Sequence, residues 1–261
     1  MFPPPASLLF ANAPRDQLEQ ELREYHLRSE QWVEWMSPYI CLVAKTDTNH
    51  VLVDTGAGGL GPNTGRLLQS LREEGVEPGD IDTVILTHGH PDHIGGNTIG
   101  DGTSAFPNAR FVMWKGEWDF WTSEEEKMKA DDHMRFLFTL AQNNLLPIQG
   151  QLDLLDRETE IIPGIRAITA PGHTPGHMAL SISSEGNRLL CVADAVLHPI
   201  HVKRPNWYAV VDFSPKQVED TRLRLFNMAA EQKALILAFH FPFPGLGHII
   251  QEDGQRQWQP I

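Results

Sequence analysis

The chain has 261 residues, of which 41% are hydrophobic, 8% aromatic and 21% charged. This is the composition of a folded globular protein, and it excludes a disordered or fibrous chain. The 34 acidic residues outnumber the 21 basic ones and give a formal charge of −13 without a dense Lys/Arg cluster, so we expect no nucleic-acid partner.

The apolar runs, the first residues and the cysteines indicate the cellular compartment in which the protein is expected. The longest runs, such as 234–239, fall far short of the roughly 20 residues that span a bilayer, so no membrane contact is expected. Residues 1–5 lack the basic and apolar regions of a secretory signal, which predicts a cytoplasmic protein. Cys41 and Cys191 lie in separate apolar runs without C-x-x-C spacing and are predicted to be buried thiols rather than a disulfide or a redox pair.

The first half of the chain predicts a β segment accompanied by helices. Residues 14–28 carry Leu18, Leu22 and Tyr25 at helical spacing and predict a short amphipathic helix. The other elements expected before residue 145 are an apolar patch at 32–36, a hairpin at 39–44 and 50–53, helices at 64–74, 115–121 and 124–144, and strands at 83–86 and 110–113.

The second half is again rich in strands. Strands are expected at 152–155, 165–170, 178–183, 188–192 and 234–238. Ser214 and Pro215 are placed to cap and open a helix that ends near residue 230. Because strands followed by surface helices occur twice, we predict an α/β fold with two sheets packed face to face and helices outside. Without a repeat or a composition break, we expect one domain over 1–261 with an N-terminal helical extension at about 1–36.

The strongest signal for chemistry directly follows the strand expected at 83–86. His88, His90, Asp92 and His93 place four N and O ligands within six residues. In an extended segment residues i and i+2 point to the same side, so His88 and His90 can share one metal ion while Asp92 and His93 turn onto a second. A polar turn whose histidines cap backbone groups is the weaker interpretation, because a strand running into four such donors is typical of a metal site.

Four ligands do not complete two metal sites, and further donors stand where apolar runs end. They are His173, Asp194 and His240. The two oxygens of a carboxylate such as Asp194 can bridge two ions, and imidazoles can complete both sites without a cysteine ligand. We therefore predict two Zn²⁺ ions, with Fe, Mn or Co compatible with the same donors.

These motifs resemble the metallo-β-lactamase superfamily. The resemblance rests on the runs 87–96 and 172–177 together with Asp194 and His240, and it covers about residues 39–248. It implies an αββα four-layer sandwich. It also implies the ligand sets: one ion held by His88, His90 and His173, the other by Asp92, His93 and His240, and both bridged by Asp194. True β-lactamases of the class usually carry a cysteine in the second site where Asp194 stands, which argues against β-lactam hydrolysis.

Three further segments, 106–109, 117–121 and 241–248, resemble the methyl parathion hydrolase branch, which shades into acyl-homoserine lactonases. The best-known lactonases place a tyrosine three residues after the bridging aspartate, where this chain has Leu197. The resemblance implies a zinc-dependent hydrolase of neutral ester-like substrates, either a lactone such as an acyl-homoserine lactone or an organophosphotriester. A hydroxide bridging the two ions would attack, and Asp92 is the expected catalytic residue that passes the proton to the leaving group.

Other functions stay open. A glyoxalase II-like thioesterase would need basic residues for the carboxylates of glutathione, and Lys203 and Arg204 are the obvious pair. A non-catalytic metal-binding protein of the same fold would hold its ion in a closed site. A diiron redox reaction is disfavoured because His90 stands where flavodiiron relatives have glutamate. The expected partner is a small neutral or apolar substrate, and the patch at 32–36 offers a surface for a homodimer.

Several residues near the expected ligands have two interpretations. Asp54 could orient a ligand histidine or cap a turn. Trp118 and Trp121 could line the substrate pocket or pack in the core, and Tyr208 could reach the pocket or pack. The glycines of 56–61 match the dinucleotide fingerprint, but the following strand lacks the acidic residue that would hold a ribose, so no nucleotide cofactor is expected.

Overall fold

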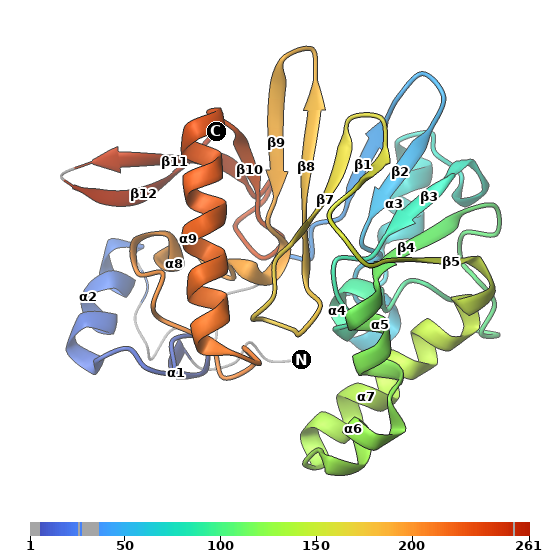
Figure 1. Cartoon of the computed structure of the whole chain (residues 1–261), viewed down its shortest axis with the longest axis horizontal. Coiled ribbons are helices and arrows are strands. Elements are labelled where there is room, and N and C mark those ends of the chain that lie inside the picture. The colour runs from blue at the N-terminus through green and yellow to red at the C-terminus, as the bar shows by residue number, and fades with distance from the viewer. Residues whose placement is uncertain (1–5, 26, 28–36, 253) are drawn as a thin grey trace. The chain divides into compact units, whose positions relative to one another are not determined.

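A computed structural model describes residues 6–25, 27, 37–252 and 254–261 of the chain. The predicted patch at 32–36 lies outside the described residues. The chain divides into two compact units, each built around one sheet (Figure 1). The five-stranded unit comprises Cys41–Glu158, and the seven-stranded unit comprises Met1–Ile40 together with Thr159–Ile261.

The sheet of the five-stranded unit has the order β1-β2-β3-β4-β5. Its strands are β1 (Leu42–Lys45), β2 (His50–Val53), β3 (Thr83–Ile85), β4 (Arg110–Trp114) and β5 (Leu152–Leu155). β1 and β2 form the predicted antiparallel hairpin, and β2 to β5 are parallel. β3 is buried along its whole length, as expected for an apolar strand in the middle of a parallel sheet. The histidine motif therefore begins at the carboxyl end of a central strand.

Helices accompany this sheet (Figure 1). They are α3 (Leu67–Glu73), α4 (Pro91–Ile94), α5 (Lys115–Thr122), α6 (Glu124–Lys129) and α7 (Asp132–Leu145), with 3₁₀ turns at Gly58–Leu60, Pro78–Asp80 and Leu146–Gln151. The prediction of one continuous helix over 124–144 is wrong. Ala130 is extended, and the Asp131 side chain accepts the backbone N–H of Met134 at 2.8 Å, so it caps a new helix.

Aromatic side chains fill the core of the five-stranded unit. Trp121 and Phe138 are fully buried, with ring centroids 5.0 Å apart, and Trp118 packs against the same cluster. Of the two interpretations of these tryptophans, core packing is therefore the one that the structure supports.

The sheet of the seven-stranded unit has the order β12-β11-β10-β9-β8-β7-β6. Its strands are β6 (Glu160–Ile162), β7 (Ile165–Thr169), β8 (Met178–Ser184), β9 (Asn187–Cys191), β10 (Leu235–Leu237), β11 (Leu246–Glu252) and β12 (Gln255–Pro260). Only β9 and β10 are parallel neighbours. β7 to β10 are the strands predicted from the sequence, whereas β6 and the β11–β12 hairpin were not predicted.

The helices of this unit are α1 (Ala6–Leu9), α2 (Arg15–Glu24), α8 (Ile200–Lys203) and α9 (Pro215–Gln232), with a 3₁₀ turn at Ala193–Ala195. α9 begins at Pro215 as predicted, and its apolar side, including Leu225 and Phe226, is buried in the core beside the sheet. Ser214 occupies the N-cap position, but its side chain makes no capping hydrogen bond, so that part of the prediction is wrong. Its backbone N–H donates instead to Gly172 O at 2.8 Å.

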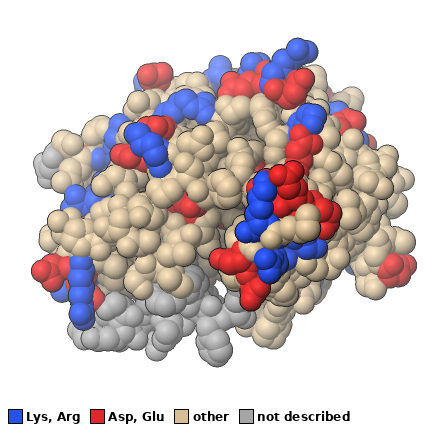
Figure 2. Space-filling view, turned by 60° about the horizontal axis from the view of Figure 1, so that its bottom comes forward, with Lys and Arg blue, Asp and Glu red and all other residues tan. Residues whose placement is uncertain are grey.

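The two cysteines form no disulfide. Cys191 is buried as predicted, whereas Cys41 is only partly buried, so the prediction of two buried thiols is confirmed for Cys191 alone. On the face drawn in Figure 2, the described Lys and Arg side chains stand among Asp and Glu rather than in a block of their own. No helix among the described residues is both long and apolar enough to cross a bilayer.

Candidate metal centre

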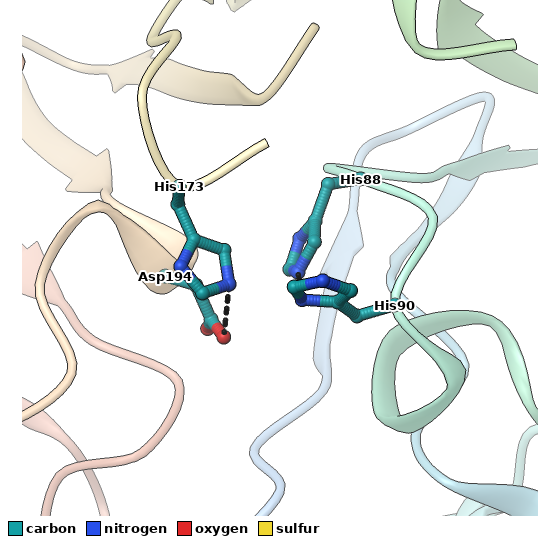
Figure 3. A group of neighbouring side chains, drawn as sticks. All are labelled: His88, His90, His173 and Asp194. Atoms are coloured by element: carbon teal, nitrogen blue, oxygen red, sulfur yellow. Dashed lines mark hydrogen bonds and ion pairs between the residues drawn. The ribbon is translucent and has the colours of Figure 1, made fainter. Parts of the chain in front are cut away.

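The loop that follows β3 carries the first group of predicted ligands. Figure 3 shows the rings of His88 and His90 turned toward each other, with His88 Nε2 3.1 Å from His90 Nδ1. The rings of His88 and His93 lie with centroids 4.0 Å apart. Asp92 and His93 belong to α4, and Asp92 Oδ2 lies 3.9 Å from His93 Nε2. The structure thus brings all four donors of this motif together.

Asp54 orients two histidines of this group, His93 directly and His88 through Thr87. Its Oδ2 accepts a hydrogen bond from His93 Nδ1 at 2.8 Å and another from the Thr87 hydroxyl at 2.8 Å, while Oδ1 accepts the Thr87 backbone N–H. Since the Thr87 hydroxyl proton is engaged by Asp54, His88 Nδ1, 3.1 Å from Thr87 Oγ1, is the donor of that contact. Both rings are therefore held with Nδ1–H donating and Nε2 available to a metal ion.

Gly89 separates the two facing histidines, and its backbone is clamped. The Gly89 N–H donates to Glu117 Oε1 at 2.8 Å, and the same oxygen accepts Trp121 Nε1–H at 2.7 Å. A Cβ on Gly89 would stand 2.2 Å from Trp121 Cδ1. The buried Glu117 and Trp121 side chains therefore fix the backbone from which His88 and His90 diverge.

The glycines of the segment 56–61 pack against the end of α4. Gly56 pairs with Ile94 in a parallel bridge, and Gly58 has a φ of +49°. A Cβ on Gly58 would stand 2.0 Å from the Gly95 carbonyl oxygen, which immediately follows α4. Glycine is required here because the turn passes against the segment that carries His93.

The second group of predicted ligands lies in the seven-stranded unit. Asp194 Oδ2 is 3.3 Å from His173 Nε2, the contact drawn as a dashed line in Figure 3, and 3.1 Å from His240 Nε2. One carboxylate oxygen thus faces the Nε2 atoms of both histidines. The backbone N–H of Asp194 donates to His177 Nε2 at 3.2 Å, which holds the turn that carries the carboxylate.

The outer nitrogens of these two histidines are also engaged. His173 Nδ1 donates to Asp212 Oδ1 at 2.8 Å, and His240 Nδ1 lies 3.1 Å from the Pro38 carbonyl and 2.8 Å from Ser37 Oγ. Acceptors at Nδ1 fix the ring orientation and leave Nε2 as the ligand atom.

The electrostatics around His173 favour a positive charge. Burial by itself lowers the pKa of the ring, but hydrogen bonds to Asp194 and Asp212 outweigh it and raise the pKa to about 9. The carboxylates that stabilise an imidazolium here would stabilise a bound cation in the same way.

The donors fit a metal centre. They are carboxylates and imidazoles, and a neutral imidazole can bind metal through one ring nitrogen. These are the ligands that suit Zn²⁺ and related divalent ions. His93, His173 and His240 each direct Nδ1 at a carboxylate or carbonyl oxygen, the arrangement that accompanies metal-bound histidine in proteins.

The sequence did not reveal every residue of this arrangement. Ser37 and Asp212 stand in no recognisable motif, and Glu117 lies in the segment 117–121 that supports the resemblance, but the sequence assigned it no role. Arg222 could have been recognised from the sequence. It lies on the same face of α9 as the apolar Val218 and Leu225, and a charged residue on such a face indicates a buried partner. Tyr208, one of the residues with two interpretations, hydrogen-bonds through its backbone N–H to Asn12 Oδ1.

Residues 35–240 match the model of the metallo-beta-lactamase superfamily, and the chain belongs to that superfamily. This confirms the family and the fold class predicted from the histidine motif. Among curated proteins, the chain is 27% identical to N-acyl homoserine lactonase of Bacillus thuringiensis over 224 residues, covering 78% of this chain and 81% of that protein. It is 26% identical to metallo-beta-lactamase domain-containing protein 1 of Xenopus laevis, over 69% of this chain and 62% of that protein.

Solved structures give the same picture. The hydrolase AbOPH of the beta lactamase superfamily superposes with a TM-score of 0.90 and 29% identity, covering 100% of this chain and 91% of that one. AidC, a dizinc quorum-quenching lactonase solved with a homoserine product, superposes with a TM-score of 0.88 and 28% identity, covering 98% and 89%. The chain is thus a hydrolase of this superfamily with lactonase relatives.

Proposed function

We propose that this protein is a dinuclear metal hydrolase that opens the ester ring of acyl-homoserine lactones. In this proposal His88, His90 and His173 would hold one ion, Asp92, His93 and His240 would hold the other, and Asp194 would serve both. The proposal rests on the orientation of three imidazoles: oxygen atoms engage Nδ1 of His93, His173 and His240, so that Nε2 of each of these rings is pre-organised to bind metal.

Divalent cations held by these residues would lower the pKa of a bound water and polarise the carbonyl of a neutral ester. The residues of the chain hold and move protons around that chemistry. Asp92 has a side chain that is 25% exposed, in contrast to the buried His93 next to it, so it can exchange protons with solvent and protonate the leaving alkoxide. Asp54 keeps His93 and His88 in a fixed tautomer while the charges change.

Two observations support a lactone as the substrate: the relatives that are lactonases, and the ion pairs that Lys203 and Arg204 already form. Lys203 binds Glu21 at 2.9 Å and Glu24 at 2.8 Å, and Arg204 binds Glu21 at 2.9 Å. These ion pairs with α2 engage the two cations that a thioesterase would use to bind glutathione. The geometry therefore favours a lactone over a glutathione thioester.

The test is a substrate panel with controlled metal content. An acyl-homoserine lactone, an aryl phosphotriester, an aryl ester and a glutathione thioester are assayed with the purified protein, with chelator-treated protein, and after Zn²⁺ is restored. We expect lactone opening that is lost on chelation and recovered with Zn²⁺. Hydrolysis indifferent to both treatments would refute the metal mechanism, and turnover of the thioester alone would refute the proposed substrate.

A variant pair tests the proton role within the same assay. Asp92→Asn should lower kcat by about 100-fold or more, because a positioned acid or base contributes about 10²–10⁴-fold. Asp101→Asn is the matched control, because Asp101 is exposed and hydrogen-bonds only locally to Thr103 in the same unit.

A further inference from the structure

Arg222 is a fully buried guanidinium on the apolar side of α9. Its side chain has no exposed surface, and Val218 and Leu225 are the buried neighbours on the same helix. Removing a charge from water is strongly unfavourable unless hydrogen bonds and an opposite charge replace the solvent. An apolar residue could fill this space at a lower desolvation cost. The role of Arg222 must therefore lie in the hydrogen bonds and the ion pair that its guanidinium makes.

Those contacts join separate segments of the seven-stranded unit. Nε donates to Ala195 O at 2.6 Å, and Nη1 donates to Pro205 O at 3.2 Å and to Trp207 O. Nη2 donates to Asp212 Oδ2 at 3.3 Å. The planar fork of arginine can serve these acceptors in several directions at once, which the single ammonium of lysine cannot.

Two of these contacts lead to proposed metal ligands. Ala195 directly follows Asp194 in a tight turn whose first residue, Ala193, has a φ of +42°. Asp212, which receives Nη2 on one oxygen, receives His173 Nδ1 on the other at 2.8 Å. One guanidinium therefore contacts both the turn that carries Asp194 and the carboxylate that orients His173.

Asp212 is held from a second side. The backbone N–H of Ala209 donates to its Oδ2 at 2.8 Å, and the carboxylate has no exposed surface. Fixed in this way, it keeps His173 Nδ1 protonated and aims Nε2 at Asp194 Oδ2, 3.3 Å away.

We infer that Arg222 and Asp212 are positioning residues of the metal centre, with Arg222 setting the placement of His173 relative to Asp194. This inference rests on the proposed function, since it takes both as metal ligands. It does not depend on which ester is cleaved.

The test uses the full-length protein and metal binding as its first measurement. Asp212→Asn, Arg222→Lys and Arg222→Met are loaded with Zn²⁺ for chelator competition and with Co²⁺ for visible absorption spectra. Asp220→Asn is the matched control, because Asp220 is an exposed residue of α9 that pairs with Lys216.

We expect Asp212→Asn and Arg222→Met to bind metal about 10- to 100-fold more weakly, the usual effect of losing a partner of a metal ligand. Their Co²⁺ spectra should shift, kcat should fall more than KM changes, and Arg222→Lys should restore part of the affinity. Asp220→Asn should match the wild type in every measurement.

The outcomes separate the two proposals. Wild-type protein that binds no divalent ion refutes the dinuclear centre itself. Wild-type protein that binds two ions, with Asp212→Asn and Arg222→Lys indistinguishable from it in affinity and spectrum, refutes the positioning role alone. Should Arg222→Met fail to fold by circular dichroism, Asp212→Asn and Arg222→Lys decide the question.

Discussion

Gly89 shows how much of the candidate site depends on a single residue without a side chain. The position lies between His88 and His90, and the indole of Trp121 occupies the space that a Cβ would need. Its N–H also donates to Glu117. Both contacts act on the backbone, so any shift there is passed to the two histidines.

Gly89→Ala is therefore expected to lower the free energy of unfolding by about 1–3 kcal/mol, the usual cost of overpacking a core. It should also weaken metal binding by displacing the two rings. Chemical denaturation and metal titration measure the two effects. Gly116→Ala is the control: its Cβ would meet only Trp114 Cδ1 at 3.7 Å, so stability should be unchanged or slightly higher. Equal behaviour of the two variants would contradict the clamp.

The residues that could be predicted are those whose spacing along the chain carries the chemistry. His88, His90 and His93 stand close together after a strand, so local geometry is enough to group them. Asp212 could not be predicted, because its contact with His173 spans 39 residues and depends on the fold of a loop. Arg222 could be predicted in part. Its position on the apolar side of α9 indicates that it has a buried partner, but it does not identify that partner.

Phe10, which follows α1, packs this helix against α8 and the loop after it. This side chain, one residue beyond α1, is buried against His201 and Trp207, with ring centroids 4.9 and 6.0 Å away. The backbone continues the contact, because Ala11 N–H donates to Tyr208 O at 2.7 Å. Phe10 thus fastens the N-terminal segment to the loop that leads to Asp212.

Phe10→Ala should lower the free energy of unfolding by about 3–5 kcal/mol, as truncation of a buried phenylalanine does. Leu8→Ala should change it by less than about 0.5 kcal/mol, because Leu8 in α1 is 42% exposed. Urea denaturation of both variants measures the difference. A loss of less than about 1 kcal/mol for Phe10→Ala would show that this contact does not hold the segment.

The elements that the sequence predicts well are those with a continuous apolar run or a clear helical period, such as β3 and α9. β11 and β12 were missed because their apolar residues do not alternate with polar ones: the large apolar side chains are Leu246, Ile249, Ile250 and Trp258, and the consecutive Ile249 and Ile250 point to opposite faces. They are strands because they pair with each other and with β10. The break between α6 and α7 depends on the cap formed by Asp131, which periodicity alone does not detect.

At the scale of the whole molecule, two buried histidines make stability depend on pH. Burial lowers the pKa of His198 to about 3, and burial together with the nearby Arg222 charge lowers the pKa of His201 well below 6.5. In the unfolded chain both titrate near 6.5. Below that pH the unfolded state binds more protons than the folded state, so stability is full above pH 6.5 and falls as the pH drops toward 3.

We expect metal-free protein to lose about 3 kcal/mol of unfolding free energy between pH 6.5 and pH 5 from these two groups. Urea denaturation at both pH values, with chelator present, measures the loss. His198→Gln should remove about half of the dependence, and His133→Gln, at an exposed position of α7, should leave it intact. A stability that is constant over this range would contradict the buried, uncharged state of the two rings.

A crystal structure of the zinc-loaded protein, with anomalous data collected at the zinc edge, tests directly whether these seven residues hold two metal ions. We expect two anomalous peaks, one beside His88, His90 and His173 and the other beside Asp92, His93 and His240, with Asp194 between them. A single peak, or peaks bound by other residues, would contradict this expectation.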